Sequence, residues 1–317
     1  MGLKITGTGH ALPERSVSNN ELAAFLDTSD EWIVGKTGIK SRFICTDENL
    51  GDLAVRAAEA ALKDAETEPG QLDYIICSTI GAEYVTPALA CLVAAKLGAG
   101  CPAFDINAAC AGFVYALDTA AAYLTGNAKH ILIVSAERMS SYVDWTDRRV
   151  SVLFGDGAGA CVVINGGALK YSKLLTNGNL KLIYIEAGSG GSPFAAPAAG
   201  KRVVHMDGPE VFKFAVQTIE RETRAALLSL DMTPDDVDYY LLHQANRRIV
   251  DSARTRLGQP AEKFPVNINR TGNTSSASIP ILLDEMRREG RIKTGDTLLL
   301  SAFGAGMTAG TCVLKWE

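Results

Sequence analysis

The chain has 317 residues, 47% of them hydrophobic, and a formal net charge of −5. This length and composition can bury a large core, as one domain or as two closely packed halves. The balanced charge excludes a global basic surface for nucleic acid, and no apolar run is long enough to cross a membrane. The seven scattered cysteines show no metal-ligand spacing. We therefore expect reduced thiols, no bound metal, no signal peptide and a cytoplasmic location.

Strands alternate with helices along the first part of the chain. The hydrophobic pattern and the capping residues predict, in chain order, a strand at residues 3–6, a polar helix at 20–25, a helix that begins within 28–33, a helix at 51–64 and a strand at 72–78. This alternation is typical of an α/β fold.

The segment 104–115 (FDINAACAGFVY) joins a short buried strand to an apolar helix that ends near residue 126. Cys110 lies at the join, where free backbone N–H groups and the helix dipole would stabilise a thiolate, the nucleophilic form of cysteine. Its small neighbours leave room for a substrate to approach. The alternative is an inert buried cysteine, a common fate for a cysteine among alanines.

The second half of the chain repeats features of the first half in the same order. An Asp-Tyr pair begins a strand in each half, and a Phe-Gly-x-Gly segment occurs at 154–157 and again at 303–306, each between two apolar strands. We therefore predict an internal duplication, with an N-terminal half at residues 1–166 and a C-terminal half at 167–317, each closed by a glycine-rich hairpin. Because the strands are continuously apolar, helices should cover both faces of the sheets.

Two polar residues in the second half occupy positions like that of Cys110. His243 ends an apolar strand, and Asn273 lies in a turn that residues 264–267 open. We expect all three residues on strand-to-helix connections at one edge of stacked sheets, where the ligand sites of α/β folds collect. Considered alone, His243 could be a satisfied polar residue at a strand end, and Asn273 could be an ordinary turn residue.

Three motifs together resemble the active-site motifs of the β-ketoacyl-ACP synthase III family. They are ACAGF at 109–113, HQAN at 243–246 and GNTSSAS at 272–278, and the similarity extends over essentially the whole chain. The resemblance implies the thiolase fold, a five-layered αβαβα core made of two pseudo-symmetric halves, and a homodimer. This agrees with the duplication predicted from the repeats.

The resemblance also implies an acyltransferase that initiates fatty acid synthesis. Such an enzyme joins an acyl-CoA primer to malonyl-ACP by decarboxylative Claisen condensation and uses no cofactor. Cys110 would carry the acyl group, and His243 and Asn273 would donate hydrogen bonds to the enolate oxygen of the decarboxylated malonyl group. The backbone N–H groups of Cys110 and Ala305 would form the oxyanion hole.

Further residues match substrate-binding positions of the family. The expected CoA-binding residues are Trp32, Lys36, Arg148 and Asn246, the acyl pocket includes Thr86 and Phe303, and the acyl carrier protein would contact Lys213, Arg248 and Arg256. Lys36 stands where the family commonly has Arg, so a point charge replaces a bidentate fork. The small Thr86, together with Ala309, indicates room for primers longer than acetyl.

Three other functions fit parts of the pattern. A specialised relative with the same Cys, His and Asn residues could form an ester, an amide or another carbon–carbon bond in secondary metabolism. A non-catalytic scaffold of the same fold would have lost the nucleophile, which is present here. A Cys-His-Asn hydrolase would share the residue types but neither the motifs nor the duplication.

Overall fold

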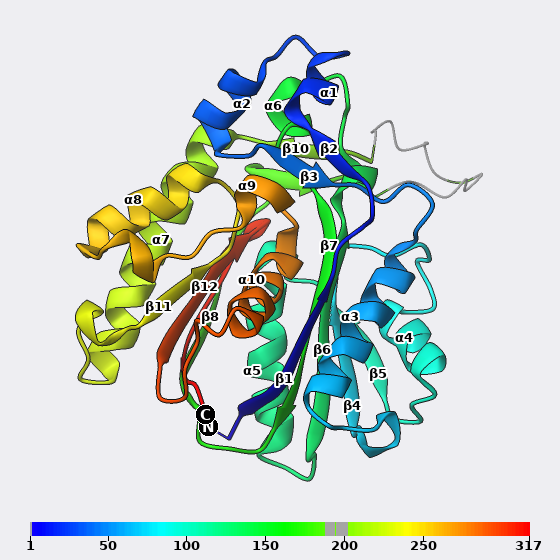
Figure 1. The fold of residues 1–317 in the computed structure, drawn as a ribbon, viewed down its shortest axis with the longest axis vertical. Coiled ribbons are helices and arrows are strands. Elements are labelled where there is room, and N and C mark those ends of the chain that lie inside the picture. Colours follow the sequence, from blue (N-terminus) through cyan, green and yellow to red (C-terminus); the bar gives the residue numbers. More distant parts are fainter. Residues whose placement is uncertain (1, 188–193, 195–201) are drawn as a thin grey trace.

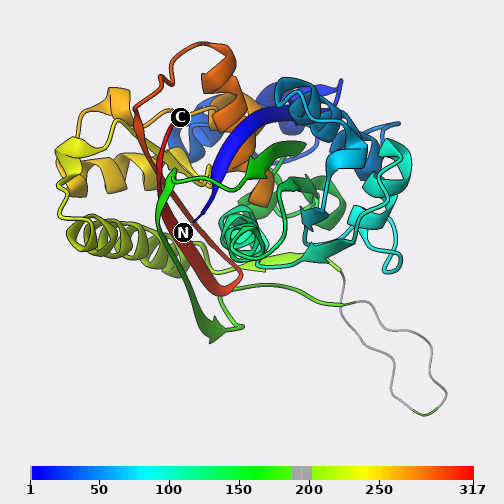
Figure 2. The ribbon, with the colours of Figure 1, turned by 90° about the horizontal axis from the view of Figure 1, so that it is seen from below.

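The computed structural model describes residues 2–187, 194 and 202–317. Two sheets lie face to face in the middle of the molecule, with two helices between them and further helices on both outer faces (Figure 1 and Figure 2). The order of the layers is therefore helix, sheet, helix, sheet, helix. This is the five-layered α/β architecture of the thiolase fold expected from the sequence.

The first sheet has the strand order β1-β7-β6-β4-β5. Its strands are β1 (Lys4–Ala11), β4 (Tyr74–Ser78), β5 (Ala103–Ile106), β6 (His130–Arg138) and β7 (Asp156–Ile164). Strand β4 pairs in parallel with β5 and β6, whereas β7 is antiparallel to β1 and β6. Helices α3 (Leu50–Asp64) and α4 (Leu89–Leu97) cover the outer face, because their alanine and leucine side chains form one apolar cluster with Ile75, Leu132 and Val162.

The second sheet has the strand order β11-β12-β13-β8. Its strands are β8 (Leu169–Asn179), β11 (Tyr239–Leu242), β12 (Thr297–Gly304) and β13 (Gly306–Lys315). Helices α7 (Gly208–Ser229) and α8 (Arg247–Leu257) cover its outer face, where they share a cluster with Tyr240, Leu299 and Val313.

Two helices fill the space between the sheets. These are α5 (Gly112–Leu124) and α10 (Ser278–Arg288), and their apolar side chains pack against Ile133 of the first sheet and Leu300 of the second. Each sheet is thus buried on both faces, as its continuously apolar strands predicted.

The remaining elements lie near the upper end of the molecule in Figure 1, beyond the carboxyl ends of the parallel strands. They are α1 (Asn19–Ala23), β2 (Ser16–Ser18), α2 (Asp30–Thr37), β3 (Ser41–Phe43), α6 (Arg148–Ser151), β9 (Ile183–Ile185), β10 (Val204–Met206) and α9 (Ile268–Thr271). No helix in the described ranges is long and apolar enough to cross a membrane.

Two sequence predictions about local structure are wrong. Residues 139–155 form a long excursion with a short helix between β6 and β7, so the Phe-Gly-x-Gly segment at 154–157 is not a hairpin, although the segment at 303–306 is one. Asn273 does not lie on the strand-to-helix connection predicted for it, because residues 264–267, which open its turn, form no strand. Pro265 has no N–H to donate to a neighbouring strand, and Phe264 stacks on Tyr240.

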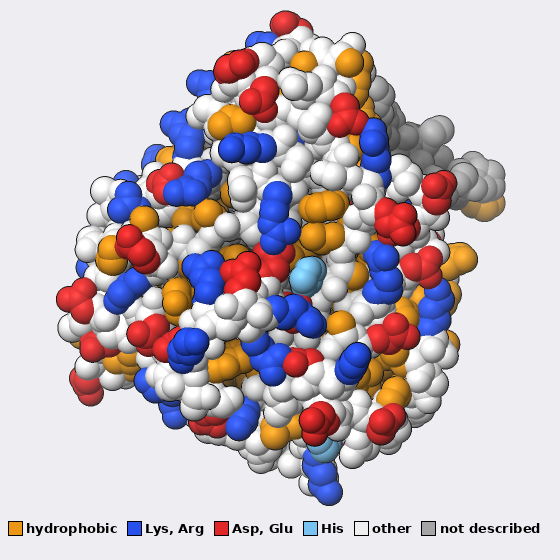
Figure 3. Space-filling view, viewed as in Figure 1, with side chains coloured by type: hydrophobic (Ala, Val, Ile, Leu, Met, Phe, Trp, Pro, Cys, Tyr) orange, Lys and Arg blue, Asp and Glu red, His pale blue; other side chains and the backbone are white. Residues whose placement is uncertain are grey.

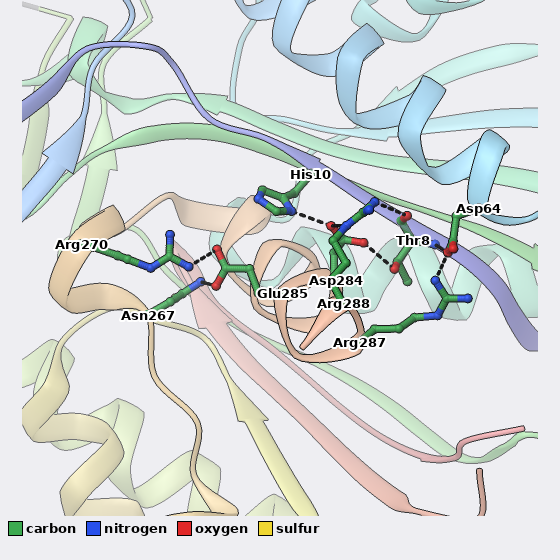
Figure 4. Close-up of polar contacts among 9 residues, drawn as sticks. All are labelled: Thr8, His10, Asp64, Asn267, Arg270, Asp284, Glu285, Arg287 and Arg288. Atoms are coloured by element: carbon green, nitrogen blue, oxygen red, sulfur yellow. Dashed lines mark hydrogen bonds and ion pairs between the residues drawn. The ribbon is translucent and has the colours of Figure 1, made fainter. Parts of the chain in front are cut away.

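Polar contacts around helix α10 fix it between the sheets (Figure 4). The buried Asp284 accepts a hydrogen bond from the Thr8 hydroxyl at 2.6 Å and contacts the His10 ring at 2.5 Å. The adjacent residue, Glu285, accepts a hydrogen bond from Asn267 at 2.9 Å. These bonds join α10 to β1 and to the segment before α9, so they hold the helix whose first residues enter the site.

Candidate active site

Cys110 lies in the connection between β5 and α5, as the sequence predicted. It belongs to a short 3₁₀ turn, Ala109–Ala111, and Ala109 has a positive φ of 49°. A side chain at Gly112 would overlap Ser78, because its Cβ would lie 1.9 Å from the Ser78 hydroxyl oxygen. The small residues therefore let the nucleophile turn sit tightly between the sheets, with Cys110 facing a cavity of about 910 Å³.

His243 follows β11 directly, and its side chain is 1% exposed. Its Nδ1 lies 2.7 Å from the Ser278 hydroxyl, whose oxygen also accepts a hydrogen bond from the Gln244 N–H at 3.3 Å. Burial lowers the pKa of His243 to about 3, so the ring is neutral at physiological pH. Since the Ser278 oxygen already accepts one bond, its hydroxyl proton is available to Nδ1, which favours the tautomer with the proton on Nε2.

Asn273 lines the same cavity, although it does not follow a strand. It comes after α9 and is held by two backbone bonds, from its N–H to the Leu153 carbonyl (2.9 Å) and from the Gly155 N–H to its carbonyl (3.1 Å). Its side-chain Oδ1 accepts a hydrogen bond from the Ser275 N–H at 2.8 Å. Because the oxygen is used in this way, the amide NH₂ is the part of the side chain available to a ligand.

The hairpin between β12 and β13 lies against the nucleophile turn. A Cβ at Gly304 would be 2.6 Å from the Cys110 backbone nitrogen, and the Thr308 hydroxyl donates to the Ala108 carbonyl at 2.9 Å. Phe303 packs edge-on against the His243 ring with 5.3 Å between ring centroids. Phe303 and Ala305 therefore lie in the cavity wall together with Cys110.

Burial raises the pKa of the Cys110 thiol to about 12, an effect that the Ser275 hydroxyl opposes and the Glu137 charge reinforces. This is opposite to the lowering expected from a helix N-terminus. The reason is that α5 begins only at Gly112, so Cys110 precedes the helix, and the surrounding protein removes water from much of the thiol although the residue keeps intermediate exposure to the cavity. Free Cys110 is therefore a thiol, and a proton must leave it before or during nucleophilic attack.

Three further residues around the catalytic groups, Glu137, Ser275 and Ser278, are revealed only by the structure. Glu137 is 0% exposed. The Ser275 hydroxyl connects it to Cys110, because its oxygen is 3.3 Å from the Cys110 sulfur and 3.0 Å from a Glu137 oxygen. Ser278 contacts His243. Both serines belong to the GNTSSAS motif, but only tertiary contacts reveal what their hydroxyls bind. Within the described ranges, no group of three or more His, Cys, Asp or Glu side chains could hold a metal ion.

Three of the four residues predicted for CoA line the cavity. These are Trp32, Lys36 and Asn246, and the Asn246 side chain donates to the Lys36 carbonyl at 3.1 Å, which joins α2 to α8. The Arg148 guanidinium lies 5.1 Å from the centre of the Trp32 ring. Its neighbour Arg149, rather than Arg148 itself, lines the cavity.

The residues predicted for the carrier protein lie on α7 and α8. Lys213 is exposed, and Arg248 lines the cavity mouth with its guanidinium 5.7 Å from the centre of the Phe212 ring. Arg256 forms an ion pair with Glu220 at 3.0 Å. Acidic and basic side chains are interspersed over the face seen in Figure 3, so any basic docking patch is local.

Thr86 does not lie in the cavity of this chain. It is exposed, next to Tyr84 and Val85, which are 60% and 96% exposed. A single chain therefore does not bring Thr86 to the acyl site.

Comparisons with known proteins cover nearly the whole chain. A family model described as 3-oxoacyl-[acyl-carrier-protein (ACP)] synthase III matches residues 104–178, and the model of its C-terminal part matches residues 227–316. A Neisseria gonorrhoeae protein named β-ketoacyl-[acyl-carrier-protein] synthase III is 44% identical over 99% of each chain.

Solved structures agree with the sequence matches. The crystal structure of 3-oxoacyl-[acyl-carrier-protein] synthase III from Aquifex aeolicus superposes with a TM-score of 0.93 at 42% identity, over 99% of this chain and 100% of that one. The priming β-ketosynthase from the R1128 polyketide biosynthetic pathway gives a TM-score of 0.93 at 36% identity, over 100% and 97% of the two chains.

Proposed function

The chain belongs to the 3-oxoacyl-[acyl-carrier-protein] synthase III family, and on this premise we propose that Cys110, His243 and Asn273 catalyse its reaction. The enzyme is an acyltransferase that joins an acyl-CoA primer to malonyl-ACP and so initiates fatty acid synthesis. The observation that carries the assignment is that all three side chains line one cavity of about 910 Å³, to which both halves of the chain contribute.

In the first half-reaction, the Cys110 sulfur attacks the thioester carbonyl of the acyl-CoA. The backbone N–H groups of Cys110 and Ala305 receive the developing oxyanion, a role supported by the contact of Gly304 with the Cys110 nitrogen. CoA leaves, and the acyl group stays on the cysteine. Covalent catalysis thereby divides a difficult carbon–carbon bond formation into two easier steps.

In the second half-reaction, malonyl-ACP loses carbon dioxide, and negative charge develops on its thioester oxygen. The neutral His243 ring, protonated on Nε2, and the Asn273 amide donate hydrogen bonds to that oxygen. Such donors are effective in a buried site, where water does not compete. The carbanion then attacks the acyl-Cys110 carbonyl, and β-ketoacyl-ACP is released. Only the two substrates are needed, because Cys110 supplies the covalent chemistry.

CoA binds at the cavity mouth in this proposal. Its adenine stacks on Trp32, beside which Arg148 lies, while Lys36 and Asn246 line the path of the phosphates and the pantetheine arm. The malonyl-ACP arm enters through the same mouth, so the carrier docks near Arg248. A cytoplasmic location fits this chemistry, since all seven cysteines are free thiols.

The functional unit is a homodimer that forms through β5. Strand β5 ends the first sheet, and in the described part of the chain no strand pairs with its outer edge. Such an edge is a template for pairing with another chain. The adjacent exposed residues Tyr84, Val85 and Thr86 would then be covered by the partner, and Thr86 would reach the partner's acyl cavity.

Intact-protein mass spectrometry after incubation with a panel of acyl-CoAs tests the proposal. We expect one acyl group per chain, and peptide mapping should locate it on Cys110. The Cys110→Ser variant should remain unlabelled, and Cys91→Ser should label normally because Cys91 is an exposed surface thiol. Labelling of Cys91 with Cys110 unmodified would refute the assignment, and so would an acylated enzyme that never consumes malonyl-ACP.

A further inference from the structure

Glu137 is a buried carboxyl group with no role in the mechanism described so far. It lies in β6 and is 0% exposed. Its Oε1 accepts hydrogen bonds from the hydroxyls of Ser275 (3.0 Å) and Ser276 (2.7 Å), and its Oε2 accepts from the Ile80 N–H (3.0 Å). A carboxyl group in such a dry place is costly unless it is paired or functional.

Ser275 connects this carboxyl group to the nucleophile. Its hydroxyl oxygen is 3.0 Å from Glu137 and 3.3 Å from the Cys110 sulfur. One hydroxyl has one proton, so when Ser275 donates to the carboxylate, its oxygen can accept the proton of the thiol. Ser275 also has a positive φ of 51°, a conformation that costs energy outside glycine and persists where the surroundings impose it.

Glu137 is the proton acceptor that hydrogen bonds connect to Cys110 through Ser275. Burial raises the pKa of Glu137 to about 7, against the opposing effect of its hydrogen bonds. Its charge also raises the pKa values of the Cys110 thiol and the Tyr142 phenol. Asp156 on the neighbouring strand β7 uses its oxygens on Ser140 and on a backbone N–H. His243 is a poor base because burial lowers its pKa to about 3.

We propose that Glu137 takes the proton of Cys110 through Ser275 and holds it for the lifetime of the acyl-enzyme. The proposal rests on the acyl-accepting role of Cys110. As the bond between the Cys110 sulfur and the acyl carbon forms, the thiol proton moves to the Ser275 oxygen and the Ser275 hydroxyl proton moves to Glu137. The carbon–sulfur bond to CoA breaks, and CoA leaves as a thiolate that takes a proton from solvent.

The second half-reaction returns the proton. When the carbanion attacks, the bond between the acyl carbon and the Cys110 sulfur breaks, and the cysteine leaves as a thiolate. The proton then moves from Glu137 through Ser275 back to the sulfur. One proton from solvent is consumed per cycle, which balances the loss of carbon dioxide from the malonyl carboxylate.

Two variants interrupt this proton relay from Cys110 through Ser275 to Glu137, and a variant of the neighbouring Ser276 does not. Glu137→Gln removes the acceptor and keeps its shape, whereas Ser275→Ala removes the bridge. Ser276→Ala is the matched control, because its hydroxyl binds the same Glu137 oxygen but makes no contact with Cys110 among the hydrogen bonds of the described residues.

The measurement is the pH dependence of Cys110 acylation by acyl-CoA in rapid-quench mass spectrometry, with alkylation by iodoacetamide as a second probe. In the unchanged enzyme the rate should rise as pH increases through about 7, where the Glu137 carboxylate forms. Glu137→Gln and Ser275→Ala should lose this rise and acylate about 100-fold more slowly at pH 8, the low end of general-base contributions. Ser276→Ala should keep the rise at a higher pH, because it removes a bond that stabilises the carboxylate.

A second readout separates this proposal from folding and from the function itself. Once fully acylated by long incubation, Glu137→Gln and Ser275→Ala should release carbon dioxide from malonyl-ACP at the unchanged rate, because that step depends on His243 and Asn273. Normal acylation with an unchanged pH profile in both variants would overturn the relay while leaving the proposed function intact. Equal losses in acylation and decarboxylation would overturn it in favour of a structural role. If the unchanged enzyme does not acylate Cys110, the proposed function itself fails.

Discussion

Replacing Ser278 by Ala tests how the enzyme selects the protonated nitrogen of His243. The change removes the hydroxyl that lies 2.7 Å from Nδ1 in a buried site. A neutral buried hydrogen bond contributes about 0.5–1.5 kcal/mol, and without it the ring samples the tautomer whose Nε2 lacks a proton. Decarboxylation should therefore fall by about twofold if the two tautomers become equally populated, and by at most about tenfold if about 1.4 kcal/mol is lost from the barrier. His243→Ala removes the donor itself and should cost about 3 kcal/mol, or more than 100-fold.

The assay is the release of labelled carbon dioxide from malonyl-ACP by enzyme that has first been acylated. Ser301→Ala is the control, because its buried hydroxyl pairs with Thr311 and not with the imidazole. The pKa of about 3 keeps His243 neutral from pH 5 to pH 9, so the rate should show no imidazole titration in that range in either enzyme. An unchanged rate in Ser278→Ala, or a loss as large as that of His243→Ala, would refute the tautomer argument.

Four further predictions concern other parts of the site. Asn273→Ala should lower carbon dioxide release about 100-fold and leave Cys110 acylation intact; loss of acylation would contradict its role as an enolate donor. Gly304→Ala should slow both half-reactions, because the new Cβ would be 2.6 Å from the Cys110 nitrogen, and stopped-flow kinetics should show a kcat effect with KM little changed. Thr86→Phe should restrict the acyl-CoAs that acylate Cys110 to those with short chains, and an unchanged chain-length preference would exclude Thr86 from the acyl pocket. Arg248→Glu should raise KM for malonyl-ACP at low salt but not at high salt, with acylation by acyl-CoA nearly unchanged.

The elements that the sequence predicted best are those whose pattern is local. The helix expected at 51–64 is α3, and the Phe-Gly-x-Gly segment at 303–306 forms the expected hairpin. Hydrophobic period and turn residues determine such elements. The prediction of a hairpin at 154–157 is wrong because the Phe-Gly-x-Gly pattern follows a long excursion in one half and forms a turn in the other. Sequence similarity between repeats does not report the length of the connection.

The same holds for the site, where the sequence predicted the residues that follow strands but not those placed by tertiary contacts. Cys110 and His243 follow strands, so the topology of an α/β fold was enough to bring them to one edge. Asn273 reaches that edge differently, through backbone bonds to Leu153 and Gly155, which no local pattern reports. Glu137 could not be predicted because its partner Ser275 is 138 residues away in sequence, and a Glu-Arg pair at the end of an apolar strand gives no signal of a buried carboxyl group.

Burial keeps both titrating catalytic side chains neutral, which favours catalysis for one and opposes it for the other. It keeps His243 neutral, which is the state needed to donate a hydrogen bond to an enolate without giving up a proton. The same burial keeps Cys110 protonated, and that state is unreactive. A neutral imidazole that already holds its proton on Nε2 cannot also relieve the thiol of a proton, so one residue cannot serve both half-reactions. The buried position that suits the enolate donor therefore requires a separate proton acceptor for the nucleophile, and Glu137 is the group bonded to Ser275 that can take this proton.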